Sequence, residues 1–484
     1  MKGRLEEKVK IATKWSAVTE ILAKLITPIV SIVLVHLLTP EAFGVVTTLT
    51  MIISFAEIFT DAGFQKYIIQ HEFSDERDFE INVNVAFWSN IIIALIIWFL
   101  ISLFSEPLAT LVGNPGLGNV VVISCISIPL IAVSGIQVAL YRRDLDFKTL
   151  FKVRMVSILV PLVVTVPLAL LLKSYWALIL GTIAQNATNS VILTLYSKWK
   201  PKLVFSFKKL KEMLSFTIWS IVESISIWLT SYVDIFIVGT LLSQYYLGLY
   251  KTSSSIVGQI MGLVTAVTTP ILFSSLSRLQ NDQHEFNRLF LKFQKYVSLL
   301  IMPLGVGIFC FSDFITSLLL GNQWTETSGF IGLWGLTSAI TIVYSYFCSE
   351  IYRAKGYPKL SAISQWLHII VLLPAILVSA KYGYETLYVT RSLVRLQLVL
   401  VNLIIMYYLV KISPLMMLKN TSHSLFSSLI MGFIGVILVQ ISDHQSYQFV
   451  SVLVCVVVYF AIIFLYKEER NIIKEQMLTR LIKR

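Results

Sequence analysis

Runs of apolar residues, each about twenty or more positions long, follow one another along almost the whole chain. About twenty apolar residues in a helix cross the roughly 30 Å hydrocarbon core of a bilayer. The polar connections between the runs are too short to form a separate soluble domain. The pattern predicts an all-α polytopic membrane protein with fourteen transmembrane helices, at 15–38, 42–65, 80–104, 118–140, 154–172, 175–197, 213–239, 247–274, 294–320, 327–351, 359–380, 384–410, 422–441 and 447–466.

The distribution of lysine and arginine agrees with this set of helices. If the N-terminus is cytoplasmic, 33 of the 39 basic residues fall in cytoplasmic segments, and the outer loops hold only Lys173 and Lys381. Cytoplasmic loops of membrane proteins carry such an excess of positive charge. The sequence therefore predicts a multi-pass protein of the bacterial cytoplasmic (inner) membrane, with both termini in the cytoplasm.

Composition and net charge support the same interpretation. Hydrophobic residues make up 56% of the 484 positions and charged residues 14%, whereas soluble domains carry about a quarter charged residues. The net charge of +12 lies in inner segments, where it faces anionic lipid headgroups, so nucleic acid is not an expected partner. Segments 205–214 and 467–484 alternate apolar and basic residues at helical spacing, which is typical of helices on the membrane surface.

Short motifs recur along the chain at a nearly constant offset. The motif at 15–18 recurs at 219–222, and the segment 37–44 recurs at 241–248, each 204 positions later. Such duplication is common in transporters. It predicts an N-lobe at 1–200, a basic cytoplasmic linker at 201–212 and a C-lobe at 213–410, followed by helices 13 and 14 with an amphipathic tail at 411–484. Because six helices per lobe is an even number, the lobes would be parallel, related by a pseudo-two-fold axis along the membrane normal, with a cleft between them that opens to each side in turn.

Three short motifs resemble a known family. The segment Leu37-Leu38-Thr39-Pro40-Glu41-Ala42-Phe43-Gly44 is similar to the first outer loop of the polysaccharide (O-antigen type) flippases of the MOP exporter superfamily. Segments 59–64 and 175–178 resemble the end of their second helix and the start of their sixth. The resemblance implies translocation of an undecaprenyl-pyrophosphate-linked oligosaccharide from the cytoplasmic to the outer leaflet by alternating access, coupled to H+ or Na+. Other polysaccharide-assembly proteins are the partners that it implies.

Basic side chains inside the predicted helices are candidate substrate-binding groups. Lys24 and Arg395 lie near the membrane midplane, and Arg391 lies one turn from Arg395. Buried cations are costly and usually face a cavity or a partner, and they would attract a pyrophosphate. Glu20 is assigned to the same cavity. In the alternative interpretation, Glu20 and Lys24 form a structural i,i+4 ion pair. The two arginines would then form ion pairs with Glu223 or Asp234 across a helix interface.

Four carboxylates are candidates for ion coupling. Glu57 and Asp61 lie four residues apart on one helix, where two like charges disfavour joint ionisation. Glu223 and Asp234 share a polar helix face with several serines and threonines, which indicates a hydrated wall. Either pair is expected to bind a proton or sodium ion, or to act as counter-ions to buried cations.

Other chemistry finds little support. The six histidines and four cysteines lack metal-ligand spacing, and the chain has no phosphate-binding loop of the ATPase type, so no cofactor is expected. An alternative interpretation is that the chain is a different transporter of the same superfamily, either a lipid II flippase or a cation-coupled drug exporter. A membrane-embedded polysaccharide polymerase or ligase is less favoured, because the outer loops are short and lack paired carboxylates or histidines. The sequence favours a secondary transporter over an enzyme.

Overall fold

The computed structural model describes residues 2–61, 63–357 and 359–471. Within these ranges, several side chains are not described, at 2–10, 13, 61, 215–220, 222–223, 267, 270–271, 273–274, 277 and 409. Every regular element of the described part is a helix and none is a strand, which confirms the all-α prediction.

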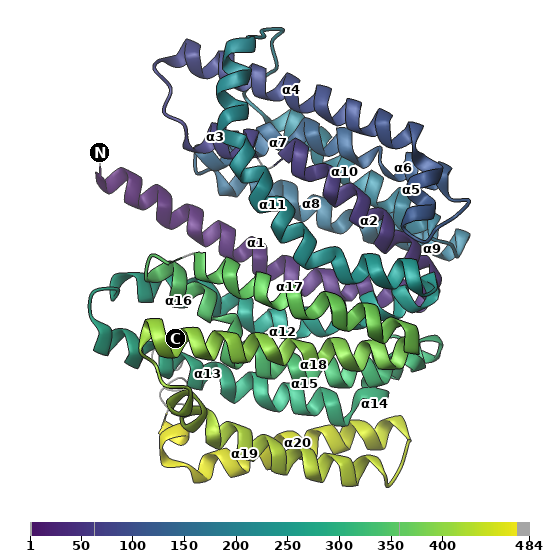
Figure 1. The fold of residues 1–484 in the computed structure, drawn as a ribbon, viewed down its shortest axis with the longest axis vertical. Helices are drawn as coiled ribbons and strands as arrows, with labels where there is room; N and C mark the ends of the chain where they lie inside the picture. Colours follow the sequence, from purple (N-terminus) through teal and green to yellow (C-terminus); the bar gives the residue numbers. More distant parts are fainter. Residues whose placement is uncertain (1, 62, 358, 472–484) are drawn as a thin grey trace. The chain divides into compact units, whose positions relative to one another are not determined.

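The chain divides into two compact units, Met1–Lys251 and Thr252–Arg484. In the first unit, α10 packs against α7 and α8, α4 packs against α7, α1 packs against α8, and α11 packs against α2 (Figure 1). Its elements are α1 (Lys2–Leu37), α2 (Pro40–Asp61), α3 (Phe64–Gln70), α4 (Glu76–Leu103), α5 (Ser105–Leu111), α6 (Gly118–Ser124), α7 (Ser127–Arg143), α8 (Phe147–Val160), η1 (Pro161–Thr165), α9 (Val166–Leu172), α10 (Trp176–Tyr196), α11 (Phe207–Leu241) and the first part of α12 (Gln244–Arg278).

The second unit is built around α13. This helix packs against α15 and α19, α18 packs against α15 and α17, and α20 lies beside α19 (Figure 1). After α12, its elements are α13 (Gln283–Cys310), α14 (Ser312–Leu319), η2 (Asn322–Thr327), α15 (Ser328–Thr341), η3 (Ile342–Tyr346), α16 (Cys348–Ala354), α17 (Lys359–Ser379), η4 (Ala380–Tyr382), α18 (Tyr384–Ile405), η5 (Met406–Val410), α19 (Pro414–Val439) and α20 (Gln445–Leu465).

Several helices begin at a residue whose side chain satisfies the first backbone amides. Asp75 caps α4, Asp146 caps α8, Ser206 caps α11 and Asp282 caps α13, each by accepting from an N–H two or three residues further on. A cap of this kind satisfies amides that have no partner within the helix. The polar residues that separate the apolar runs therefore also fix where these helices start.

Thirteen helical segments in the searched part of the chain are long and apolar enough to cross a membrane. They correspond to thirteen of the fourteen predicted helices. The eighth predicted helix is covered by α12, a 35-residue helix in which several side chains lie outside the described residues. The polytopic architecture is confirmed, and the number fourteen stays a prediction.

A reciprocal contact joins the starts of α2 and α12. A Cβ atom on Gly44 would overlap the carbonyl oxygen of Gln244, and a Cβ atom on Gly248 would overlap the carbonyl oxygen of Pro40. Gln244 and Gly248 are the counterparts of Pro40 and Gly44 at the 204-residue offset. Each copy of the repeated segment thus touches the other through matching atoms, which is the geometry of a two-fold axis.

Candidate functional site

Six of the eight candidate site residues have side chains that the structure describes: Glu20, Lys24, Glu57, Asp234, Arg391 and Arg395. The side chains of Asp61 and Glu223 lie outside the described residues.

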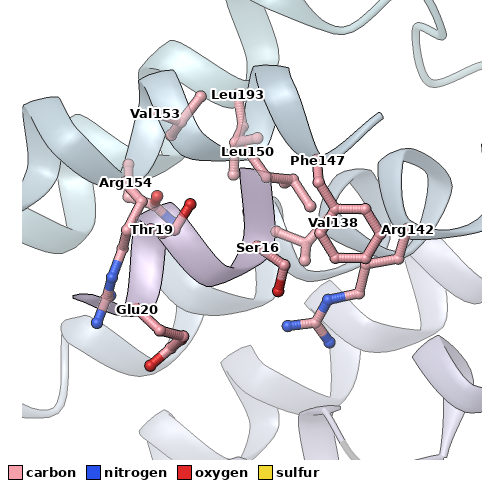
Figure 2. A pocket seen from close by; sticks show the side chains of 11 residues that line it. Ser16, Thr19, Glu20, Val138, Arg142, Phe147, Leu150, Val153, Arg154 and Leu193 are labelled. Atoms are coloured by element: carbon pink, nitrogen blue, oxygen red, sulfur yellow. The ribbon is translucent and has the colours of Figure 1, made fainter. Parts of the chain in front are cut away.

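The first group of polar residues surrounds a cavity of about 420 Å³ in the first unit. Its wall is formed by α1, α7, α8 and α10 and includes Glu20, Arg142, Arg154 and Asn189 (Figure 2). Lys24, one turn further along α1, is half-buried and is not part of this wall. The pairing of Glu20 with Lys24, the alternative interpretation of these two side chains, stays a prediction.

Arg391 and Arg395 stack on one buried aromatic ring in the second unit. Both arginines lie on α18, and the ring belongs to Trp334 of α15, which is 8% exposed. The guanidinium carbons lie 5.1 Å and 3.8 Å from a Trp334 ring centroid, and Arg395 Nη1 donates to Ser338 Oγ at 2.8 Å. A cation held over an aromatic face keeps its charge inside the bundle, while the edge of its guanidinium plane can still bind an anion.

Asp234 lies in a buried polar contact between α11 and α12. It is 6% exposed, its Oδ2 accepts from the Tyr250 hydroxyl at 2.7 Å, and its Oδ1 accepts from the Ile235 amide at 2.8 Å. The Lys251 amine interacts electrostatically with the same carboxylate. Asp234 and Lys251 each lie seven residues from the ends of their helices at the shared turn, so both are about 10 Å below it.

Glu57 is half-buried on α2, next to the contact between α2 and α11. In that contact Trp228 Nε1 donates to Ser54 Oγ at 3.1 Å, and the Trp228 ring lies 4.8 Å from that of Phe55. The helix that carries Asp234 is therefore held against the helix that carries Glu57. The structure brings two of the four coupling candidates onto packed helices of one unit.

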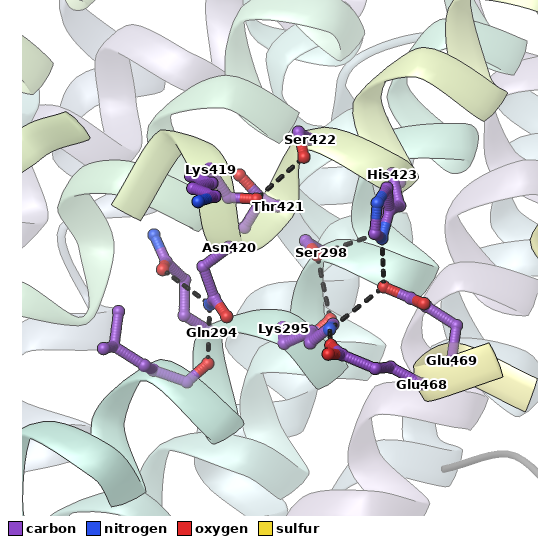
Figure 3. Close-up of polar contacts among 12 residues, drawn as sticks. Gln294, Lys295, Ser298, Lys419, Asn420, Thr421, Ser422, His423, Glu468 and Glu469 are labelled. Atoms are coloured by element: carbon purple, nitrogen blue, oxygen red, sulfur yellow. Dashed lines mark hydrogen bonds and ion pairs between the residues drawn. The ribbon is translucent and has the colours of Figure 1, made fainter. Parts of the chain in front are cut away.

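A charged cluster that sequence reasoning missed joins the chain after α20 to α13 and α19. Glu469 is 1% exposed, and its Oε1 lies 2.7 Å from His423 Nδ1 and 3.0 Å from Lys295 Nζ (Figure 3). Lys295 also binds Glu468 at 2.6 Å, and the His423 ring stacks on Tyr466. Burial raises the pKa of Glu469, but the hydrogen bonds from His423 and Lys295 outweigh it, and the pKa lies below its ordinary value.

Sequence spacing gives no signal for most of these contacts. Trp334 and the two arginines are more than fifty residues apart, and Lys295, His423 and Glu469 come from three distant segments. Among the described residues, no group of three histidine, cysteine, aspartate or glutamate side chains could hold a metal ion.

Many packed apolar helices, with lysine, arginine and carboxylate side chains held among them, define a multi-pass membrane protein of transporter architecture. The chain belongs to the polysaccharide biosynthesis protein family, whose model matches residues 33–329. The resemblance seen in segment 37–44 is thereby confirmed.

Relatives share low identity over most of the chain. An uncharacterized membrane protein in the cps region of Klebsiella pneumoniae is 21% identical over 77% of this chain and 76% of its own. The succinoglycan biosynthesis transport protein ExoT of Rhizobium meliloti is 23% identical over 69% of this chain and 66% of its own. The lipopolysaccharide biosynthesis protein WzxC of Escherichia coli is 22% identical over 66% and 65%.

Solved structures with the same fold are membrane transporters. The lipid II flippase MurJ in an inward closed conformation matches with a TM-score of 0.77 and 16% identity, over 95% of this chain and 100% of that chain. An inward-facing multidrug resistance MATE family transporter of the MOP superfamily matches with a TM-score of 0.61 and 12% identity, over 82% and 98%. At these identities the likeness shows the fold, and it confirms the predicted fold class.

Proposed function

We propose that this protein is a flippase that moves an undecaprenyl-pyrophosphate-linked oligosaccharide, the repeat unit of a surface polysaccharide, from the cytoplasmic to the outer leaflet. The observation that carries the proposal is the family match over residues 33–329. The names of the relatives ExoT and WzxC, which refer to succinoglycan transport and lipopolysaccharide biosynthesis, support it. The MurJ fold supports a lipid-linked substrate.

The proposed transport path relies on buried cations. Lys24, Arg391 and Arg395 attract the negative charge of the pyrophosphate as it passes the bilayer, and Glu20 belongs to the same path. The stacking of both arginines on Trp334 supports this role, because an aromatic face stabilises their positive charge inside the bundle, and guanidinium groups bind phosphate oxygens. Lobes at 1–200 and 213–410, joined by a linker at 201–212 and followed by 411–484, would alternate access to the path.

Coupling to a proton or sodium gradient is assigned to the carboxylates Asp234, Glu223, Glu57 and Asp61. Asp234 is supported by its burial and by its contacts with Tyr250 and Lys251. A proton or cation bound there would change the charge balance between α11 and α12, which is the kind of local change that biases two conformations. The protein acts in the inner membrane with both termini in the cytoplasm, as the distribution of basic residues favours.

Deletion of the gene tests the proposed function. Lipid-linked repeat units are expected to accumulate on the cytoplasmic leaflet, and surface polysaccharide is expected to fall, while the wild-type copy restores both. Unchanged surface polysaccharide together with increased drug sensitivity would point to a drug exporter. Loss of cell-wall synthesis with normal surface polysaccharide would point to a lipid II flippase.

A further inference from the structure

The polar cavity between α1, α7, α8 and α10 holds two guanidinium groups to which the transport path above gives no role. Arg142 lies one residue before the end of α7, and Arg154 lies in the second turn of α8. Neither side chain makes a hydrogen bond or an ion pair within the described part of the chain. Two arginines at one cavity without a carboxylate partner favour an anionic ligand from outside the chain.

The rest of the wall supplies further donors. Ser16 contributes a hydroxyl donor from α1, whereas the Thr19 hydroxyl at the same wall donates to the Trp15 carbonyl oxygen at 2.7 Å. Asn189 of α10 accepts from Ser157 Oγ at 3.4 Å through its side-chain oxygen, so its amide nitrogen remains a donor. Figure 2 shows the Arg142 and Arg154 side chains on opposite sides of the view, with Ser16 and Glu20 between them. Polar donors from the four helices α1, α7, α8 and α10 therefore surround a single space.

The cavity lies at one end of the helix bundle. Its residues come from the start of the span Lys14–Leu37, the end of Gly118–Arg143, the start of Phe147–Leu172 and the end of Trp176–Tyr196. Successive spans cross in opposite directions, so these four ends lie on one face, which is the cytoplasmic face in the proposed orientation. That depth is the headgroup region of the inner leaflet. The volume of about 420 Å³ is that of a small-ligand pocket.

We propose that this cavity binds the diphosphate group of a lipid in the inner leaflet, as a loading site that precedes the transport path. The identity of the lipid rests on the proposed function. Guanidinium groups bind phosphate oxygens in a bidentate manner, and a diphosphate offers two phosphates for the two arginines. Glu20 places a carboxylate at the same cavity, and its repulsion of the anion keeps the affinity low enough for release.

Binding of farnesyl diphosphate, a short lipid diphosphate, tests the site. The full-length protein in phosphatidylcholine nanodiscs is titrated, and the bound fraction is read by native mass spectrometry. Arg142→Gln and Arg154→Gln are each expected to weaken binding at least about tenfold, because each removes a charge-assisted contact. Lys152→Gln is the matched control: this exposed lysine of α8 does not line the cavity, and its loss should change binding by less than about twofold.

A fourth variant separates a binding role from a merely structural one. Glu20→Gln removes the repelling charge and is expected to tighten farnesyl diphosphate binding, whereas damage to the fold would weaken it. Wild-type affinity in both arginine variants would overturn the proposal. Equal competition by phosphatidylglycerol in the nanodisc, or by inorganic phosphate, would overturn the diphosphate assignment, while weak competition by both supports it. Because binding is measured without transport, failure of the site and failure of the flippase function give different results.

Discussion

Arg395 illustrates how a charged side chain is stabilised inside an apolar bundle. Its guanidinium carbon lies 3.8 Å from a Trp334 ring centroid and its Nη1 donates to Ser338 Oγ. A desolvated cation–π contact contributes about 2 kcal/mol, which offsets part of the cost of placing the charge there. The sequence identified Arg391 and Arg395 as intramembrane charges, but the ring that holds them depends on how α15 and α18 pack.

Removal of the Arg395 guanidinium is expected to reduce transport strongly. In Arg395→Ala, surface polysaccharide should fall at least about tenfold, because the pyrophosphate loses a charge-assisted contact. Arg395→Lys keeps the charge but loses the planar stack, so an intermediate level is expected. The measurement is surface polysaccharide in a deletion strain carrying each variant at equal protein level.

Arg288→Ala is the matched control. This arginine of the second unit pairs with Glu285 three residues earlier, and the two side chains are 72% and 44% exposed. A solvated pair of this kind contributes little, so polysaccharide should stay near the wild-type level. Wild-type polysaccharide in Arg395→Ala as well would contradict an anion-handling role for that arginine.

The Glu469 carboxylate is expected to make stability depend on pH. Its pKa in the folded protein is lowered, so its ionised form contributes stability above the ordinary glutamate pKa of about 4.3, and this contribution is lost as pH falls below that value. Glu469→Gln should cost about 1–3 kcal/mol at pH 7 and should flatten the loss of Tm that occurs as the pH falls below about 4.3. Thermal unfolding of the detergent-solubilised protein measures both effects.

Glu468, the residue before Glu469, provides the control for the pH dependence of Tm. Glu468 also binds Lys295, but its side chain is 76% exposed, so Glu468→Gln should change Tm little and keep the pH dependence. If Glu469→Gln kept the acid-induced loss of Tm in full, the contacts with His423 and Lys295 would not be its source.

Helix ends differ from the predicted ones where local chemistry acts. The seventh predicted helix starts at 213, whereas α11 starts at Phe207, because Ser206 caps it and the amphipathic stretch continues the helix. The fifth predicted transmembrane helix, at 154–172, is expected to be a single α-helix, but the π-helical turn η1 begins at Pro161 within it. Hydrophobic periodicity reports how many residues cross the membrane, and it does not report such local adjustments of the backbone.

The contact between α2 and α12 is expected to tolerate no side chain larger than hydrogen at its glycines. Gly248→Ala places a methyl group on the carbonyl oxygen of Pro40, so the two helices must separate. A loss of about 1–3 kcal/mol is expected, seen as a lower Tm in detergent.

Gly258→Ala on the same helix is the control, since nothing lies within 4 Å of the added methyl group. Alanine there should be neutral, or stabilising by up to about 1 kcal/mol through its helix propensity. Equal Tm values for the alanine variants at 248 and 258 would show that the close approach of α2 and α12 does not contribute to stability.

For the whole molecule, single-cysteine labelling tests the proposed orientation. In the described structure the four native cysteines are buried or half-buried, so they are expected to react slowly with the maleimide. Replacing them leaves the introduced cysteine as the only site of labelling. Lys173→Cys should react with a membrane-impermeant maleimide in intact cells, while Lys208→Cys in the basic linker should react only after lysis. The reverse result would show that the termini face the outside.

Fold class and family were predictable from the sequence because they depend on features that repeat along the chain. These features are the long apolar runs, the excess of lysine and arginine in the predicted cytoplasmic segments, and the motif at 37–44. Each of them is kept when single residues are substituted. The candidate site was predictable only in part. Intramembrane charge identified Lys24, Arg391 and Asp234, whereas Trp334, Tyr250 and Glu469 acquire their roles through contacts between segments distant in sequence.

The matched pair at Gly44 and Gly248 has a consequence for how such a chain arises. Two copies of a half-length protein, each carrying one version of the segment, would meet through the same self-complementary atoms across a dimer axis. Fusion of the two copies into one chain turns that dimer interface into an intramolecular contact between the repeats. A bulkier residue on one side then has to be accommodated by the opposite copy, so the two segments are constrained to diverge together.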